Sequence, residues 1–186
     1  PIAELAMSMD RDTVPEMAKA FGFEQDLSIP LSVTQSVAPI PADNAQVAIS
    51  SIGQLDVRAT PLQIAMISAG IANDGVVMQP YLVDRVITPD LRTEQQFEPS
   101  EFATPISKST AQAMQSMMEN GVNAAEGAAS GARIEGARVG GKTGTAENGL
   151  DENGEALPFT LWFTGYAFMG DKQVAVAVVI EDGGGE

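Results

Sequence analysis

The sequence predicts an α+β fold in which helices pack against an antiparallel sheet. Three observations lead to this prediction. Residues 1–121 contain several segments with apolar residues at helical spacing, most of them next to capping residues. Residues 138–181 change to the alternating period of β-strands, and their connections are short. The chain has 186 residues, 44% of them hydrophobic, which is enough to bury the core of one domain.

Helices are expected mainly in the first two thirds of the chain. Their ranges are Pro1–Met7, Thr13–Phe21 with Asp12 or Thr13 as cap, Asn44–Ser51, Thr60–Asn73 and Ser107 to about Gly121. The clearest of them has Thr60 at the N-cap and Pro61 at the first position, and it ends at Asn73-Asp74-Gly75. The helix after Ser107 carries a stripe expected to be buried, namely Ala111, Met114, Met117 and Met118.

The segments between these helices are expected to be less regular. Residues 24–43 contain three prolines among Ser, Thr and Gln, which predicts an irregular connection. Val76–Thr88 alternates like a strand, and Pro80 restricts its start to a sheet edge. Residues 89–106 are expected to be a peripheral polar excursion with a short strand near Glu94–Phe97. Gly and Ala dominate residues 121–141, which is typical of a mobile loop.

Three strands are expected in the last third of the chain. They are Arg138–Glu147, Phe159–Met169 and Gln173–Glu181. A Gly-rich excursion joins the first two strands, and a tight turn at residues 169–172 joins the last two. Short connections favour an antiparallel meander, in which each strand pairs with the next one along the chain.

The composition excludes several classes of function. Ten basic residues against 25 acidic ones give a net charge of −15, so phosphate backbones and anionic lipids would be repelled, and no nucleic acid partner is expected. The chain has no Cys and no His, which excludes disulfides, Ser-His-Asp and Cys-His sites and the common zinc sites within it. We expect no metal and no cofactor. Proton transfer must then use lysine, carboxylate or hydroxyl groups.

The run from Gly141 to Glu147, Gly-Lys-Thr-Gly-Thr-Ala-Glu, is the most informative stretch of the chain. On a strand, Thr143 and Thr145 present hydroxyls on one face, because side chains alternate, and Lys142 adds a positive charge. Gly144 lets a peptide backbone lie along the strand, with the Thr145 N–H aimed at its carbonyl oxygen. These groups suit carboxylate binding and oxyanion stabilisation in acyl transfer.

Two other interpretations of this run are open. It can be an ordinary strand entry with an exposed lysine. Residues 136–143 also match the spacing G-x-x-x-x-G-K-T of a phosphate-binding loop. Such a loop needs a preceding strand and a helix that starts at Lys-Thr, whereas Ala124–Gly136 is small and polar and Gly144 follows directly. Nucleotide binding is therefore a minor alternative.

Four parts of the chain resemble the C-terminal half of the transpeptidase domain of class B penicillin-binding proteins, most of all the actinobacterial cell-division type. They are Met17–Phe23; Ile49–Gln54 with Ala59–Ala65 and Ile71–Gly75; Gly140–Ala146; and Leu161–Ala167 with Val174–Glu181. They occur in the family's order and cover nearly the whole chain. K-T-G is one of the elements that mark this fold, beside S-x-x-K and S-x-N. The expected fold is therefore the penicillin-binding/serine β-lactamase-like one.

This resemblance implies a serine D,D-transpeptidase that cross-links peptidoglycan stem peptides and is acylated by β-lactam antibiotics. It implies a catalytic role for Lys142, Thr143 and Gly144, that of Lys142 being electrostatic. It also implies that Thr143 and Thr145 bind the substrate. The resemblance further implies an extracytoplasmic enzyme with roles in cell division and cell shape. An N-terminal segment absent here would anchor it to the membrane, and division proteins are expected as further partners.

The chain departs from the family pattern in lacking the nucleophile. No Ser-x-x-Lys occurs in it, and Ser8-Met9-Asp10 resembles S-x-D only by coincidence, at a helix end. We therefore expect residues 1–186 to be the C-terminal part of a single transpeptidase domain, inactive without its N-terminal half. Because the family places an N-terminal strand beside the last one, Val174–Ile180 should be an unprotected edge here. The alternative is a catalytically inactive binding module with the same fold.

Overall fold

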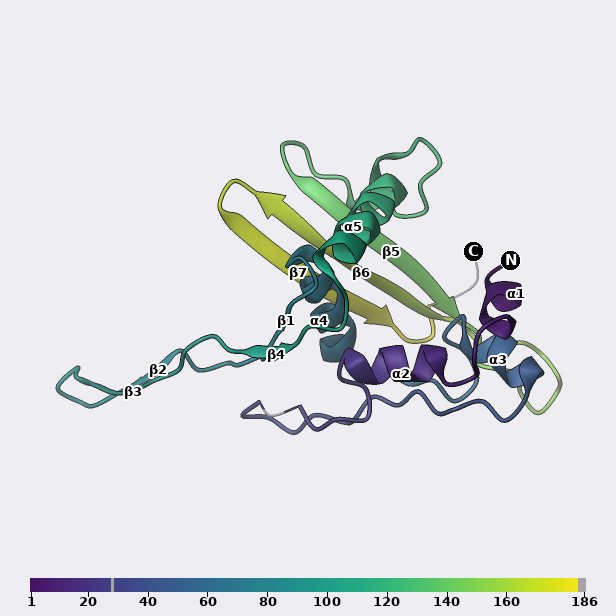
Figure 1. The fold of residues 1–186 in the computed structure, drawn as a ribbon, viewed down its shortest axis with the longest axis horizontal. Helices are drawn as coiled ribbons and strands as arrows, with labels where there is room; N and C mark the ends of the chain where they lie inside the picture. The colour runs from purple at the N-terminus through teal and green to yellow at the C-terminus, as the bar shows by residue number, and fades with distance from the viewer. Residues whose placement is uncertain (28, 184–186) are drawn as a thin grey trace.

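The computed structural model describes residues 1–27 and 29–183. Its centre is a three-stranded antiparallel sheet in the order β5–β6–β7 (Figure 1). The strands are β5 (Arg138–Ala146), β6 (Thr160–Met169) and β7 (Lys172–Ile180). Each strand pairs with the next without a break in register, so the predicted meander is confirmed.

Helices α4 (Pro61–Ala72) and α5 (Lys108–Asn123) pack on one face of this sheet, in front of the strands in Figure 1. Tyr166 of β6 is 2% exposed and lies against Ile71 of α4 and Met118 of α5. Paired residues of antiparallel strands point to the same side, so Gly140 and Ala175, the partners of Tyr166, share this face. The predicted α+β arrangement is confirmed.

The helix boundaries follow the capping residues. The side chains of Thr60 and Ser107 each accept a hydrogen bond from the backbone N–H three residues further on, as predicted, and Asp43 does the same. The remaining α-helices in the described residues are α1 (Ile2–Met7), α2 (Thr13–Ala20) and α3 (Asn44–Ser50). Asp12, one of the two predicted caps, takes the N-cap position of α2 but makes no side-chain capping bond.

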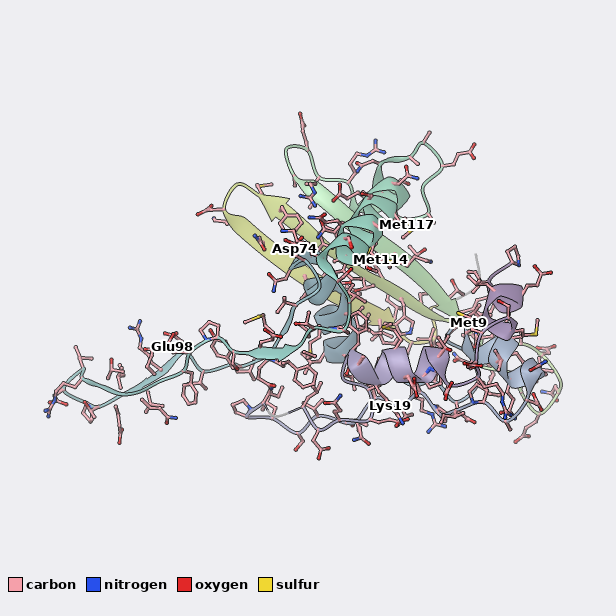
Figure 2. The ribbon with its side chains drawn as sticks, in the orientation of Figure 1. Met9, Lys19, Asp74, Glu98, Met114 and Met117 are labelled. Carbon is pink, nitrogen blue, oxygen red and sulfur yellow. The ribbon has the colours of Figure 1, made fainter. Side chains whose placement is uncertain are left out.

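The segment after α4 does not form the single strand predicted for Val76–Thr88. It forms a long two-stranded arm that projects from the body of the molecule (Figure 1). Its strands are β1 (Val77–Met78), β2 (Arg85–Ile87), β3 (Thr93–Gln96) and β4 (Glu101–Ala103), paired β1 with β4 and β2 with β3. Proline at position 80 lacks an N–H for a ladder, which fits the break between β1 and β2. Figure 2 shows side chains, Glu98 among them, projecting on both sides of the arm.

The buried stripe of α5 differs from the predicted one. Met117 is 60% exposed, because it lies roughly 100° around the helix from the buried Met118. The buried residues of α5 are Ala111, Gln115, Met118 and Val122. Gln115 was not expected in the core, but its side chain donates to the backbone oxygen of Ile71 at 2.7 Å. A satisfied amide can thus take a core position.

The segment 121–141 is more regular than the predicted loop. Its first three residues complete α5, Ser130–Ala132 form the short 3-10 helix η1, and β5 begins at Arg138. Ala129 and Val139 are buried together with Val122, so the Gly- and Ala-rich segment folds back onto the sheet. Small side chains allow this close packing.

The connection before α3 is irregular, as predicted. Residues 24–27 and 29–43 contain no helix or regular strand, and an isolated bridge joins Val37 to Arg58. Glu24 also donates its N–H to the oxygen of Ser36. These bonds bring residues 52–59 close to the end of α2 and to Phe23, which is 5% exposed.

The last strand has an open edge. Among the described strands, β7 pairs only with β6. This agrees with the unprotected edge expected for Val174–Ile180. The side chains of Val174, Val176, Val178 and Ile180, on the face away from α4, are exposed as well. Within the described ranges, none of the helices combines the length and the apolar character that crossing a bilayer requires.

Candidate active site

Strand β5 changes from buried to mostly exposed at Lys142. Val139, Gly140 and Gly141 are buried, whereas Lys142 and Thr145 are exposed. Gly144 is also exposed, and Thr143 is half-buried. In the described part of the chain β5 pairs with β6 alone, so its other edge is open beside the K-T-G residues. An open edge of this kind can receive an extended peptide as an added strand.

The two glycines before the lysine are required by packing. A Cβ at position 140 would collide with the ring of Tyr166. A Cβ at position 141 would come within 2.8 Å of the Phe163 ring, closer than real Cβ contacts. Residues 139–141 of β5 are therefore packed closely around the side chains of β6. The mostly exposed residues 142–146 extend directly from this well-packed part of the strand.

The four candidate residues divide between the two faces of the sheet. Lys142 is paired with Thr164 and Gly144 with Trp162, on the face that α4 covers. Thr143 is paired with Phe163 and Thr145 with Leu161, on the opposite face. The predicted alternation is present, with both threonine hydroxyl groups on one side and the lysine on the other.

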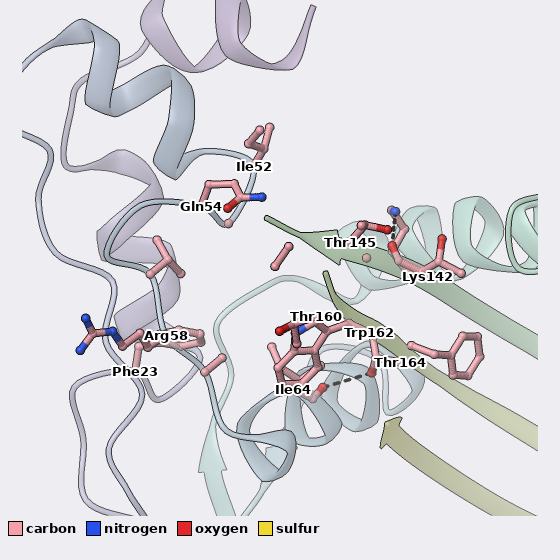
Figure 3. A pocket seen from close by; sticks show the side chains of 17 residues that line it. Phe23, Ile52, Gln54, Arg58, Ile64, Lys142, Thr145, Thr160, Trp162 and Thr164 are labelled. Atoms are coloured by element: carbon pink, nitrogen blue, oxygen red, sulfur yellow. Dashed lines mark hydrogen bonds between the residues drawn. The ribbon is translucent and has the colours of Figure 1, made fainter. Parts of the chain in front are cut away.

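A pocket of about 520 Å³ adjoins the K-T-G residues. Residues 52–59, α4, β5 and β6 meet around it. It is lined by Phe23, Ile52, Gly53, Gln54, Val57, Arg58, Ala59, Ile64, Lys142, Thr143, Gly144, Thr145, Ala146, Thr160, Trp162, Phe163 and Thr164. Figure 3 shows Lys142 and Thr145 on one side, Gln54 and Arg58 on the other, and Trp162 and Ile64 between them. The walls are mostly apolar, with lysine and threonine groups at one rim.

The ammonium group of Lys142 has no carboxylate partner among the described residues. It donates to the backbone oxygen of Thr143, next to it in the strand. Lys19 and Lys108, by contrast, form ion pairs with Glu24 and Asp74. In a chain with a net charge of −15, an exposed lysine without a carboxylate partner leaves a local positive charge for an anionic ligand.

Thr164, the residue of β6 that is paired with Lys142, links the sheet to α4. Its hydroxyl lies 2.6 Å from the hydroxyl of Ser68, which is 1% exposed. It also lies 3.0 Å from the backbone oxygen of Val176 in β7 and 3.4 Å from that of Ile64 in α4. One side chain thus connects β6 to β7 and to the helix.

A polar network anchors the opposite end of β5. Arg138 donates to Glu119 at 2.6 Å and to Gln115 at 2.7 Å, and its guanidinium lies 4.7 Å from the centre of the Phe168 ring. The hydroxyl of Tyr166 lies near the same Glu119 carboxylate. Burial, with a further contribution from the charge of Glu119, raises the pKa of Tyr166 above its ordinary value. This network fixes the start of β5 on α5.

The structure also tests the sequence alternatives. Lys142 and Thr143 lie inside β5 and no helix begins there, so the nucleotide-loop interpretation is wrong. Ser8 follows the last residue of α1 and donates to Leu5 at 2.7 Å, which agrees with its assignment to a helix end. Within the described residues, no three Asp or Glu side chains form a group that could hold a metal ion.

The pocket wall formed by residues 52–59 was not predicted as part of the site. These residues follow α3 and precede α4; residues 52–54 and 59 lie in segments that carry the family resemblance, without an assigned role, and residues 55–58 lie in none. Trp162 and Phe23 belong to parts of the chain singled out for resemblance, without an assigned role. Their position beside Lys142 depends on tertiary packing, which local sequence patterns do not encode.

The comparisons with known proteins agree with the geometry. The family model described as "Penicillin binding protein transpeptidase domain" matches residues 1–186. The peptidoglycan D,D-transpeptidase PbpA of Mycolicibacterium smegmatis is 40% identical over 182 residues, covering 97% of this chain and 36% of the relative. Stage V sporulation protein D of Bacillus subtilis is 30% identical over 184 residues, covering 96% of this chain and 28% of the relative. The chain thus spans about a third of the length of these relatives.

Solved structures show the same fold. The crystal structure of PBPA from Mycobacterium tuberculosis superposes with a TM-score of 0.84 at 33% identity, covering 98% of this chain and 40% of that one. The ceftriaxone acyl-enzyme complex of the same protein gives a TM-score of 0.87 at 34% identity, with the same coverage. On these grounds the chain belongs to the transpeptidase domain family of class B penicillin-binding proteins.

Proposed function

We propose that this chain is the C-terminal part of a single transpeptidase domain in a serine D,D-transpeptidase that cross-links peptidoglycan and binds β-lactams. The observation that carries the proposal is the open edge of β5, where Lys142 and two threonines border a pocket. Acyl transfer from a D-alanyl peptide needs a cation and hydroxyls for the carboxylate and N–H donors for the oxyanion. This edge can supply all of these groups.

Each residue of the edge has a proposed role. Lys142 attracts the terminal carboxylate of the peptide or β-lactam and stabilises negative charge, and Thr143 and Thr145 donate their hydroxyls to that carboxylate. The Thr145 N–H stabilises the oxyanion. Gly144 lies opposite Trp162 and presents no side chain, so a ligand backbone can approach the strand.

The nucleophile must come from elsewhere, because no Ser-x-x-Lys occurs in these 186 residues. We propose that the N-terminal half of the same domain supplies it and packs against this chain. The relatives are about three times as long as the matched region, which supports this proposal. The whole protein is then extracytoplasmic and anchored to the cell membrane, and it serves cell division and cell shape together with division proteins.

Labelling with a fluorescent penicillin tests the proposed function. The full-length protein and residues 1–186 alone are each incubated with the reagent and separated on a denaturing gel. Covalent label on the full-length protein, absent after replacement of its nucleophilic serine, is the expected result. No label should remain on residues 1–186, because they contain no activated serine. Stable label on the short chain would contradict the assignment of the nucleophile.

A second candidate is a catalytically inactive binding module with the same fold. The absence of Ser-x-x-Lys from this sequence favours it. The two candidates differ in the labelling experiment, because an inactive module binds peptide or β-lactam without forming a covalent bond. A full-length protein that stays unlabelled but is stabilised against heat by the β-lactam would support the inactive module.

A further inference from the structure

Thr164 lies directly opposite Lys142 in the sheet and meets α4 on the same face. Its hydroxyl is within hydrogen-bonding distance of three oxygens, those of Ser68, Val176 and Ile64. Among the described residues, the side-chain hydrogen bonds between α4 and the sheet all involve Thr164. Thr164 is therefore the polar link between the helix and the sheet, beside the apolar contact of Ile71 with Tyr166.

The chemistry of the three partners fixes the direction of these bonds. A hydroxyl has one proton to donate, whereas a backbone oxygen can only accept. Thr164 lies 3.0 Å from the Val176 oxygen and 3.4 Å from the Ile64 oxygen, so its proton goes to one of these two carbonyl groups. The short 2.6 Å contact is then a bond from Ser68 to Thr164. The result is a directed chain from helix to β6 to β7.

Burial makes the Ser68 end of this chain of bonds difficult to replace. Ser68 is 1% exposed, and Thr164 is half-buried in the pocket wall. Around Ser68 water cannot easily take over a lost partner, and an unpaired polar group is costly, whereas the bond from Thr164 to Val176 is exposed. The bond between Ser68 and Thr164 therefore helps to fix the distance between β6 and α4. Because β5 is paired to β6 residue by residue, the same bond also helps to fix the position of Lys142 relative to α4 and the pocket.

We propose that Thr164 and Ser68 are positioning residues, which hold Lys142 in the position relative to the pocket that the acyl-transfer reaction requires. This inference rests on the proposed function, because it assumes that Lys142 acts in the reaction. In this proposal neither hydroxyl contacts the reacting atoms, although Thr164 lines the pocket. Their loss therefore slows the chemical step more than it weakens ligand binding, since small displacements of a catalytic group reduce the rate steeply.

The test is single-turnover acylation of the full-length protein by a fluorescent penicillin, measured over a range of concentrations. This measurement separates the limiting acylation rate from the apparent dissociation constant. Thr164→Val removes the hydroxyl but keeps the shape, and Thr164→Ser keeps the hydroxyl. Ser68→Ala probes the same junction with a smaller change. Ile71→Val is the control, because it weakens the contact of α4 with the core away from the pocket.

We expect Thr164→Val to lower the limiting rate roughly ten-fold and Ser68→Ala roughly three-fold, with dissociation constants within about two-fold of wild type. Thr164→Ser should return close to the wild-type rate, and Ile71→Val should keep it. Wild-type rates in both Thr164→Val and Ser68→Ala would overturn the inference. An equal loss of rate in Ile71→Val would do so too, since general destabilisation would then explain the effect.

Failure of the proposed function gives a different result. In that case the wild-type protein itself is not acylated, and the inference falls with the function. Should Thr164→Val not fold, Ser68→Ala alone decides, because alanine is well tolerated inside a helix. An acylated wild type with an unaffected Ser68→Ala variant would then count against the positioning role alone.

Discussion

The ring of Tyr166 occupies the space beside Gly140 that any side chain at position 140 would need. We therefore expect Gly140→Ala to lower the free energy of unfolding by about 1–3 kcal/mol, the usual cost of overpacking a core. Urea unfolding of the full-length protein measures this change. Gly131→Ala is the matched control, because, apart from its own stretch of chain, no atom of the described residues lies within 4 Å of the place that its Cβ would take. Similar stability of both variants would show that the core around Tyr166 can relax.

The hydroxyl of Tyr166 is expected to stabilise the fold in a pH-dependent way. It lies 3.2 Å from the backbone oxygen of Gln115 and 3.3 Å from the Glu119 carboxylate, so Tyr166→Phe should cost about 1 kcal/mol at neutral pH. Burial, the larger cause, and Glu119 raise the pKa of Tyr166, which means that the folded state holds the proton more tightly. This contribution is complete below the ordinary tyrosine pKa of about 10 and is lost as the pH rises above it.

The corresponding measurement is the difference in unfolding free energy between wild type and Tyr166→Phe at pH values on both sides of that point. The difference should be constant below about pH 9 and should shrink above about pH 10. Tyr81→Phe, which removes a tyrosine hydroxyl at an exposed position in the arm, is the control. A difference that grows with rising pH would contradict the assignment.

Replacement of Lys142 should remove activity without unfolding the protein. Lys142 is exposed and donates only to its neighbour's backbone oxygen among the described residues, so Lys142→Ala should leave thermal stability nearly unchanged. Penicillin acylation should fall by about 100-fold, the typical effect of losing one charge-stabilising group. Lys172→Ala, at the exposed start of β7, is the matched control. If both variants are acylated normally, Lys142 has no part in the reaction.

Gly144 should behave differently from Gly140. The nearest atom to a Cβ at position 144 is Cβ of Trp162 at 3.4 Å, which is ordinary contact, so Gly144→Val should change stability by less than about 1 kcal/mol. It should raise the apparent dissociation constant for penicillin more than about ten-fold, because the new side chain lies where a ligand would approach. Thermal unfolding and acylation of the same preparation measure the two effects. Unchanged binding would place the ligand away from this strand.

Local sequence signals predicted the regular parts of this fold well. Thr60 and Ser107 cap their helices as expected, because a capping hydroxyl and the N–H it binds are three residues apart in the chain. The three strands of the sheet were predicted because their alternation is long and their connections are short. The alternation also placed the K-T-G side chains correctly on the two faces of the sheet.

Features that depend on distant contacts were not predicted. Gln115 enters the core because its amide reaches the end of α4, 44 residues earlier in the chain. The arm breaks the strand expected for residues 76–88, and its pairing joins segments that local patterns treat separately. The part of the pocket wall made by residues 52–59 owes its position to the bridge between Val37 and Arg58. Such contacts are decided by tertiary packing rather than by propensity.

The change from buried to exposed residues along β5 has a consequence for the evolution of drug resistance. Residues 139–141 are constrained by the core, so substitutions there would be removed by misfolding before any antibiotic acts. Residues 142–146 have less packing to preserve, so they can vary while the protein still folds. Under the proposed function, resistant lineages would accumulate changes on this side of Lys142, where loss of antibiotic binding must be balanced against loss of cell-wall synthesis.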